Sequence, residues 1–587
     1  MTLVEGTSFC VCDQAGDVHP GSPQGVVFRD TRIVSAWRVT LDDQPLEPLA
    51  VMSTEPWCAT FVGRAAPRPG RSVSTLLLRR DRFVGQGMRE DLQLQNLGDE
   101  AAAVRLHVEV DADFADLFEV KESRVPPPAP GEVTAEGGSL RLVRSYGASG
   151  TSRGVQVSCD EAVATRDGLL VEVVVPARGE WRGVVQVLPV LDGEVLPPRY
   201  PAERPVRESE PALGFQDWLR STGVVRSEDA AVVHTLQRSR EDLGALRIVD
   251  PEHPDDVVAA AGAPWFMALF GRDSLLTSYM ALPIDQSLAL GTLRTLARLQ
   301  GRRVDLASEE EPGRILHEVR FGADPALALG GSSVYYGTVD ATPLFVTVLG
   351  ELRRWGLGLE EVDALLPHAD RALDWVTEYG DRDGDLFVEY QRSTDRGLVN
   401  QGWKDSSDGV TFAHGTVARG PIALCEVQGY VYAAFRARAE LAGEIGDEEG
   451  RWGWTERAEA LKAAFNERFW LPDQGWYALA LDGEKRPVDS LASNMGHCLW
   501  SGIVDDDKAP QVAERLLSPE MFTGWGVRTL ASSMGAYNPL SYHNGSVWPH
   551  DNALVAAGLM RYGFAVEARR VALGVLQAAE AFGGRLP

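Results

Sequence analysis

The pattern of hydrophobic and polar positions changes once along this chain, near residue 200. Up to about residue 195, apolar and polar residues alternate in short Val-rich segments separated by Gly, Pro, Asp and Asn. Such alternation is typical of antiparallel strands that bury one face, so residues 1–195 are predicted to form a β-sandwich. Residues 196–212 are rich in Pro, Arg and Glu and are predicted to be a linker.

From residue 213 onward, apolar residues recur at spacings of three and four, which is the period of amphipathic helices. The pattern predicts about eleven helices that are joined by loops. A double ring of six inner and six outer helices, the (α/α)6 barrel, gathers such loops at one end. We therefore predict an α+β multidomain protein in which the β-sandwich is followed by an (α/α)6 barrel over residues 213–587. We expect the last element of the barrel to be absent from this chain.

Loops at the starts of the predicted helices combine aromatic residues with carboxylates and cations. In NQGWKDSSDG (400–409), Asp405 follows Trp403 and Lys404 within a turn rich in Gly and Ser. Similar mixtures occur in PWFMALFGRDS (264–274), YYGTVDATP (335–343), GPIALCEVQGY (420–430) and YNPLSYHNGSVWPHD (537–551). Aromatic rings stack on sugar rings and carboxylates transfer protons, so these loops together predict one carbohydrate-binding site.

The candidate substrate-binding residues lie in these loops or elsewhere between the predicted helices. They are Trp265, Arg272, Asp273, Tyr336, Asp340, Trp403, Lys404, Gln428, Trp525, His543, Asn544, Trp548 and His550. Each acidic candidate also has a purely structural explanation. Asp405 and Asp273 have the residue type of a helix N-cap, and Glu426 would complement the dipole at a helix start. The loop tryptophans are equally compatible with a place in the core.

Longer motifs add a resemblance to a known family. PWFMALFGRDS, GRILHEVRFG, YYGTVDATPLF, GWKDS, GPIALCEVQGY and NGSVWPHDNAL, with GVVFRDTRIVSAWRV and DADFADLFEVK nearer the N-terminus, resemble the bacterial amylo-alpha-1,6-glucosidases, which are glycogen debranching enzymes. The helical region is similar, more distantly, to trehalases and to glycoside hydrolase family 63. The resemblance implies a β domain, an (α/α)6 glycosidase domain, and hydrolysis with inversion by one Asp acid and one Glu base.

The same resemblance assigns the general acid to Asp405. In the family, a segment like Arg585–Pro587 continues into the Glu that serves as the base. Here we expect the base to lie beyond Pro587 or to be replaced by Glu426, with Asp273 and Asp340 as further candidates. Inversion requires the two carboxyl groups to stand roughly 6.5–9.5 Å apart, so that a water molecule fits. Lys404 would lower the pKa of Asp405 if it pointed inward, but alternation along an extended loop predicts that it points elsewhere.

The predicted function is the hydrolysis of α-glucosidic bonds, at α-1,6 branch points of glycogen or of related α-glucans. One alternative is a glycosidase for a small α-glucoside or α-mannoside, and another is a carbohydrate-binding protein that has lost catalysis. A phosphorylase is a third alternative, which dependence of cleavage on phosphate would indicate. The sequence contains no P-loop, dinucleotide fingerprint or metal-ligand spacing, so no cofactor and no metal are expected.

Composition restricts the partners and the compartment. The 587 residues carry a formal net charge of −27, which argues against nucleic acid or an anionic membrane as partner. No apolar run reaches the ~18 residues of a membrane span, and the N-terminus lacks the features of a signal peptide. Six cysteines without zinc-type spacing are expected to be reduced and mostly buried. The predicted location is cytoplasmic, and the oligomeric state stays open.

Overall fold

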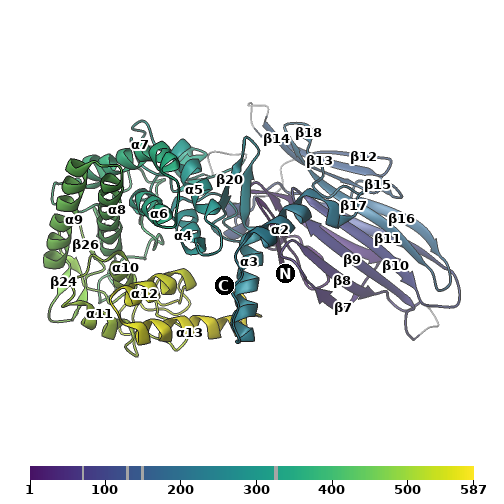
Figure 1. Ribbon diagram of the computed structural model, residues 1–587. Helices are drawn as coiled ribbons and strands as arrows, with labels where there is room; N and C mark the ends of the chain where they lie inside the picture. The colour runs from purple at the N-terminus through teal and green to yellow at the C-terminus, as the bar shows by residue number, and fades with distance from the viewer. Residues whose placement is uncertain (69–71, 127–130, 147–150, 323–327, 587) are drawn as a thin grey trace.

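The computed structural model describes residues 1–68, 72–126, 131–146, 151–322 and 328–586. Figure 1 shows a strand-rich N-terminal region beside a helical C-terminal region, which confirms the predicted order of the two. The six cysteines are free and buried, as expected. No helix within the described residues is long and apolar enough to cross a membrane.

Three antiparallel sheets make up the described N-terminal region. The four-stranded sheet follows the order β1 (Thr2–Glu5), β2 (Ser8–Val11), β3 (Gly25–Phe28), β4 (Thr31–Val34). The nine-stranded sheet follows the order β12 (Glu132–Glu136), β13 (Ser139–Tyr146), β14 (Thr151–Ser158), β17 (Glu180–Leu191), β10 (Met88–Asn96), β9 (Leu76–Val84), β8 (Cys58–Arg64), β7 (Glu47–Met52), with β18 (Glu194–Val195) beside β17. The five-stranded sheet follows the order β15 (Val163–Thr165), β16 (Gly168–Val175), β11 (Ala102–Asp111), β5 (Ala36–Leu41), β6 (Gln44–Pro45).

The nine-stranded and five-stranded sheets share one hydrophobic core. Along β11, Val104, Leu106, Val108 and Val110 are buried, whereas Arg105 and Glu109 between them are exposed. Leu78 of β9 and Leu94 of β10 belong to the same core cluster as these β11 residues. The alternation read from the sequence therefore corresponds to strands that bury one face, as a sandwich requires.

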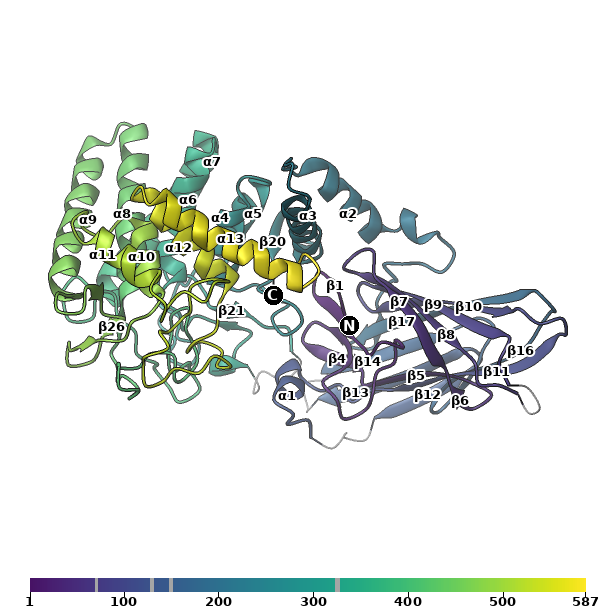
Figure 2. The same cartoon turned by 90° about the horizontal axis from the view of Figure 1, so that it is seen from below.

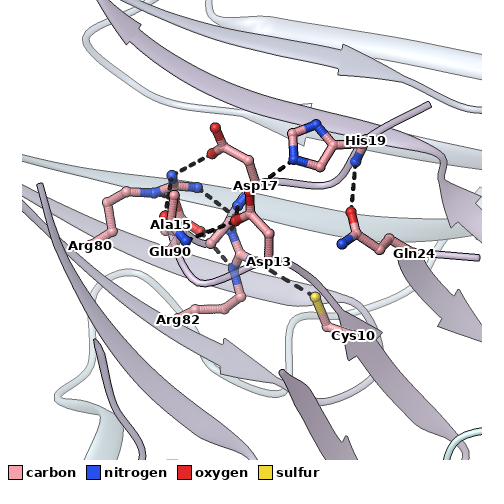
Figure 3. A network of polar contacts seen from close by, with 10 residues as sticks. Cys10, Asp13, Ala15, Asp17, His19, Gln24, Arg80, Arg82 and Glu90 are labelled. Atoms are coloured by element: carbon pink, nitrogen blue, oxygen red, sulfur yellow. Dashed lines mark hydrogen bonds and ion pairs between the residues drawn. The ribbon is translucent and has the colours of Figure 1, made fainter. Parts of the chain in front are cut away.

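A buried ion network links β9 and β10 to the turn after β2 (Figure 3). Glu90 accepts hydrogen bonds from Arg80 Nε and Arg82 Nε, both at 2.7 Å. The carbonyl oxygen of Gly16 accepts from both guanidinium groups, and Asp17 pairs with Arg80 Nη1 at 2.6 Å. Burial raises the pKa of Glu90, but the charges of Arg80 and Arg82 outweigh burial, so the net shift is downward.

We predict that Glu90→Gln lowers the free energy of unfolding by about 3–5 kcal/mol, because two buried guanidinium groups lose their counter-charge. Urea titration provides the measurement. The pKa of Glu90 is depressed in the folded state, so its stabilisation is present above the unfolded-state pKa and is lost as the pH falls through the folded-state value.

The control is Glu47→Gln, which removes an exposed ion pair with Arg64 (2.7 Å) and should cost less than about 1 kcal/mol. Equal losses in the two variants would contradict the assignment of stability to the buried network.

The predicted linker packs against the N-terminal region. Tyr200 is only 2% exposed, and its ring stacks on Trp57 with the centroids 5.5 Å apart. Arg89 donates to the carbonyl oxygens of Pro201 and Arg204. A short 3-10 turn, Val206–Glu208, precedes α2 (Glu210–Ser221). The segment is therefore held in place, and the predicted boundaries of the linker and the two domains stay a prediction.

The helical region contains buried helices, each packed against a more exposed partner. In the described residues, five buried helices contact one another in succession: α4 (Gly271–Ala281), α6 (Ala341–Arg354), α8 (Cys425–Glu444), α10 (Asn494–Ser501) and α12 (Pro549–Arg561). Their partners are α5 (Ser287–Arg298), α7 (Leu359–Trp375), α9 (Glu448–Arg468), α11 (Ala509–Leu516) and α13 (Ala565–Ala581). A further helix, α3 (Ala230–Ala245), contacts both α2 and α13.

Figure 1 shows these helices following one another around an arc, with α3 standing next to the N-terminal region. Short strand pairs lie between them: β19 (Arg247–Asp250) with β20 (His253–Ala259), β21 (Glu318–Val319) with β22 (Val334–Tyr335), β24 (Trp470–Leu471) with β25 (Trp476–Tyr477), and β23 (Ala423–Leu424) with β26 (Ala480–Leu481) and β27 (Pro487–Val488). The arrangement in pairs is that of a helical-hairpin fold, and the complete (α/α)6 barrel stays a prediction.

One short helix of the N-terminal region, α1 (Leu117–Lys121), faces the helical region (Figure 2). Leu117 is buried in the same hydrophobic cluster as Ala260 and Met267 of the helical region. Next to it, Asp30 accepts a hydrogen bond across the interface, from the Phe321 backbone N–H at 2.7 Å. The N-terminal region is thus docked by both apolar and polar contacts close to the helix starts that carry the predicted site.

Candidate functional site

A cavity of about 600 Å³ opens between α1 and the loops at the starts of α4 and α12. Seven of the predicted site residues line it, although they come from three separate stretches of the chain. These residues are Arg272, Asp273, Trp403, Asp405, His543, Trp548 and His550. Three of the five mixed loops, 264–274, 400–409 and 537–551, therefore contribute to one cavity, whereas 335–343 and 420–430 do not line it.

Arg272 lies at the centre of the polar side of the cavity. It is 8% exposed, and its Nη1 donates to Asp340 Oδ2 at 2.9 Å and to the Gly402 carbonyl oxygen at 3.1 Å. Its Nη2 donates to Asp405 Oδ2 at 3.3 Å, and its Nε lies 3.7 Å from Asp273 Oδ2. Burial lowers the pKa of Arg272, but the three carboxylates outweigh burial and shift it upward. The guanidinium is therefore a fixed cation that ties three loops together.

Asp405 presents a partly exposed carboxyl group to this cavity, with 28% of its side chain exposed. Burial raises its pKa, Arg272 lowers it, and the charges of Asp273 and Asp340 raise it again, which brings it to about 6. A carboxyl group with this pKa is partly protonated near neutral pH and can donate a proton to a bound substrate. Asp405 lies in a loop outside any helix, so the N-cap explanation for it does not hold.

Aromatic side chains also line the cavity. The ring of Trp403 makes edge contacts with His543, Trp548 and His550, at centroid distances of 5.6, 6.2 and 5.3 Å. His543 and Trp548 stack on each other at 5.5 Å. Rings held at fixed angles in this way offer flat apolar surfaces to a sugar ring while their polar edges stay available.

Both histidines of the aromatic side are neutral at physiological pH. Burial, followed by the charges of Lys404 and Arg272, lowers the pKa of His543 to about 3. Burial also lowers the pKa of His550 to about 4. His543 Nδ1 lies 2.7 Å from the Ser406 hydroxyl oxygen, next to Asp405. Neutral rings here can donate or accept hydrogen bonds to sugar hydroxyl groups without adding charge.

Three predicted residues lie beneath the cavity wall and do not line it. Asp340 is fully buried, at the N-cap position of α6, and its oxygens accept from Thr338 and Arg272. Lys404 donates its ammonium to the Thr529 carbonyl oxygen at 2.6 Å, so it points away from Asp405, and burial lowers its pKa to about 8. Glu426 lies buried in the first turn of α8, where burial raises its pKa and its Oε1 has no hydrogen-bond partner among the described residues.

The other predicted contacts lie elsewhere in the structure. Trp265 packs on the cluster between the two regions, and the Tyr336 hydroxyl donates to the Leu299 carbonyl oxygen. The Gln428 side chain bonds both backbone groups of Val388, and Asn544 Nδ2 donates to the Asp408 carbonyl oxygen. Trp525 is 54% exposed and lines a different hollow, beside the C-terminal end of α13. None of these five lines the cavity as described.

Two family models match parts of this chain. Residues 3–186 match the family model of the N-terminal domain of (some) glycogen debranching enzymes. Residues 354–584 match the family model of the mannosylglycerate hydrolase MGH1-like glycoside hydrolase domain. The predicted resemblance is confirmed. Over both matched regions the chain is similar to glycoside hydrolases and to domains that accompany them.

Two solved structures are similar in fold to the chain. Neutral trehalase Nth1 from Saccharomyces cerevisiae matches at 14% identity and a TM-score of 0.42, over 58% of this chain and 71% of the trehalase. The glycoside hydrolase family 63 mannosylglycerate hydrolase from Thermus thermophilus, in complex with Tris, matches at 16% identity and a TM-score of 0.44, over 55% of this chain and 88% of that structure. No curated protein matches the chain.

Several residues that line this cavity were missed by sequence reasoning. The most notable is Glu318, which is 1% exposed and whose Oε1 has no hydrogen-bond partner among the described residues. Burial raises its pKa to about 7. Glu318 lies in the motif GRILHEVRFG, which contributed to the family resemblance but did not indicate a role for this residue. The others are mainly aromatic residues and the residues of α1 and the turn after it: Phe266, Phe270, His317, Tyr542, Phe118, Lys121, Glu122 and Arg124.

A separate cluster of Asp381, Asp383 and Asp385 brings three carboxylates close enough to share a cation. The Lys485 ammonium pairs with Asp383 at 3.0 Å and with Asp385 at 2.7 Å. The Asp381 carboxylate accepts backbone hydrogen bonds from residues 384–386. A lysine and the local backbone therefore already satisfy these acids, and the cluster is explained as the structure of a turn.

We predict that Asp340→Asn lowers the pKa of Asp405 below about 6. The charge of Asp340 raises that pKa, and its removal also leaves Arg272 free to pair more strongly with Asp405. Infrared difference titration of the carboxyl band, with Asp405→Asn subtracted to isolate its signal, measures the shift. An unchanged or higher pKa in a folded Asp340→Asn protein would contradict the described electrostatics.

Proposed function

We propose that this chain is an inverting glycoside hydrolase that cleaves α-glucosidic bonds, with Asp405 as the general acid. The observation that carries the proposal is a carboxyl group with a raised pKa, about 6, in a cavity that is also lined by the aromatic side chains around Trp403. The match of residues 354–584 to a glycoside hydrolase model supports the same reaction class.

In this mechanism Asp405 transfers its proton to the glycosidic oxygen while the bond from that oxygen to the anomeric carbon breaks. A water molecule attacks the anomeric carbon from the opposite face, and a second carboxylate takes the proton of that water. Arg272 holds Asp405 in position, and after the transfer it stabilises the carboxylate that forms. Glu426 is the candidate for this base.

The first substrate candidate is the α-1,6 branch point of glycogen or a related α-glucan. The match of residues 3–186 to a domain of glycogen debranching enzymes supports it. The second is a small α-glucoside or α-mannoside, which is favoured because α1 walls one side of a cavity of about 600 Å³. A carbohydrate-binding protein without catalysis is the alternative of a different class.

We predict that the chain releases β-glucose from an α-glucoside and that Asp405→Asn reduces kcat by about 10²–10⁴-fold, the usual contribution of general acid catalysis. Proton NMR that resolves the anomers of the product, with panose, isomaltose, maltose and a glycogen limit dextrin as substrates, measures both. Preference among these four substrates distinguishes branch-point cleavage from the cleavage of small glucosides.

Glu426→Gln tests the base in the same way as Asp405→Asn tests the acid. Turnover at the wild-type rate in Glu426→Gln would assign the base elsewhere. Release of α-glucose as the first product would contradict inversion. Binding of maltooligosaccharide without any turnover by the wild-type chain would favour the binding-protein alternative.

A pH profile tests the role of Asp405 independently. Because the acid must be protonated and burial raises its pKa to about 6, kcat/KM should fall about tenfold per pH unit above that value. In Asp340→Asn the inflection should move to lower pH. A profile that stays flat from pH 6 to pH 9 would exclude a carboxyl group of this pKa as the acid.

A further inference from the structure

The N-terminal region contributes directly to the cavity through α1, and α1 is held there firmly. Its N-cap residue Asp116 accepts from the Phe118 backbone N–H, while the Glu119 side chain accepts from the Asp116 N–H in return. Leu117 and Val120 are buried beneath the helix. Four residues from 118 to 124 then face the cavity. This helix is therefore a fixed wall of the cavity.

A cluster of charges across the domain interface fixes this wall to the strand that carries Glu318. Arg320, two residues after Glu318, lies 3.3 Å from Asp30 Oδ2 and 3.8 Å from Asp116 Oδ1. Its guanidinium also stacks over the Phe118 ring at 4.0 Å. Asp30 and Asp116 belong to the N-terminal region, so the position of α1 relative to Glu318 is set by ion pairs as well as by packing.

Two complementary polar groups face the cavity at this interface. The Lys121 ammonium lies 4.3 Å from the centroid of the Phe266 ring and has no ion-pair partner within the described parts of the chain. Burial lowers its pKa, while the charges of Asp405 and Glu318 raise it. Glu318 is buried with an unpaired carboxylate oxygen. A buried acceptor without a partner is costly unless a ligand or water satisfies it, which marks Glu318 as part of a binding site.

The charges around the cavity favour a neutral ligand for these two groups. The described lining contains Lys121, Arg124 and Arg272 against Glu122, Asp273, Glu318 and Asp405. Arg272 is already paired with Asp340, and Arg124 is paired with Glu122. The Lys121 ammonium is close to the carboxyl groups of Glu318 and Asp405, and their charges would weaken its binding of an anion. An ammonium donor and a carboxylate acceptor beside an aromatic ring instead suit the hydroxyl groups of a sugar.

We propose that α1 of the N-terminal region builds the subsite for the leaving group, in which Lys121 and Glu318 hydrogen-bond the hydroxyl groups of a neutral sugar ring. The proposal rests on the proposed function, and it gives the N-terminal region a role in substrate recognition. Asp405, which lines the same cavity, stands where the bond between this ring and the cleaved glucose would lie.

The test compares a substrate that has a leaving-group sugar with one that has none. For isomaltose or maltose, Lys121→Met and Glu318→Gln should each lower kcat/KM about tenfold or more, mostly through KM, as expected for the loss of one charged hydrogen bond. For α-glucosyl fluoride, whose leaving group is a fluoride ion, both variants should keep kcat/KM within about twofold of the wild type. Arg178→Met is the matched control, because Arg178 is an exposed cation of the N-terminal region that is paired with Asp99 and does not line the described cavity, and it should change neither substrate.

Equal losses on the disaccharide and on the fluoride would overturn the proposal, because Glu318 or Lys121 would then act on the cleaved glucose or on the fold. Unchanged activity of both variants on both substrates would also overturn it. A further comparison uses the α-glucosides of glycerol and of glyceric acid. A wild-type preference of about tenfold or more for the glucoside of glyceric acid would show that the subsite binds an anion, and it would overturn the proposal of a neutral sugar.

Calorimetric binding separates this proposal from the proposed function. If the wild-type chain hydrolyses none of these substrates, the proposed function fails, whereas the subsite is still tested by affinity. Both variants should then bind maltose about tenfold more weakly and bind glucose as the wild type does. Unchanged maltose affinity in both variants would overturn the subsite.

Discussion

The buried guanidinium of Arg272 is the contact on which the candidate site depends. It joins the first turn of α4, the N-cap position of α6 and the loop that carries Asp405, three places far apart in the sequence. A buried cation of this kind must be paired, since removing one partner of a buried ion pair costs about 3–5 kcal/mol. The same contact that holds the loops together therefore also fixes the position of the acid.

The electrostatics of Asp405 follow from a balance around this cation. Arg272 alone would hold the carboxyl group ionised, but burial and the two neighbouring aspartates outweigh it and bring the pKa to about 6. Lys404, the adjacent residue in the sequence, turns to the Thr529 carbonyl oxygen and adds no direct pairing. The neutral histidines add no charge either. The resulting pKa of the Asp405 carboxyl group is the one that the proposed general acid would need near neutral pH.

The two regions of the chain meet at this cavity, so neither region by itself contains all of it. The matched families cover residues 3–186 and 354–584, whereas Arg272, Asp273 and Glu318 lie between them. Residues of α1 complete the wall from the N-terminal side. The ion pairs of Arg320 with Asp30 and Asp116 hold that wall against the helical region. In the proposed subsite, Lys121 of the N-terminal region and Glu318 of the helical region would hold the same leaving-group sugar.

The sequence by itself determined the order of strands and helices, because apolar periodicity records which face of each element is buried. It also predicted that Arg272, Trp403, Asp405, His543 and His550 belong to one site, since aromatic rings and carboxylates together suit a carbohydrate-binding site. Only the tertiary structure decided that the Gln428 side chain hydrogen-bonds the Val388 backbone and that Glu318 and Lys121 face the cavity. Those outcomes depend on which distant segments pack together and on how deeply each charge is buried. A local pattern of residues carries no record of either.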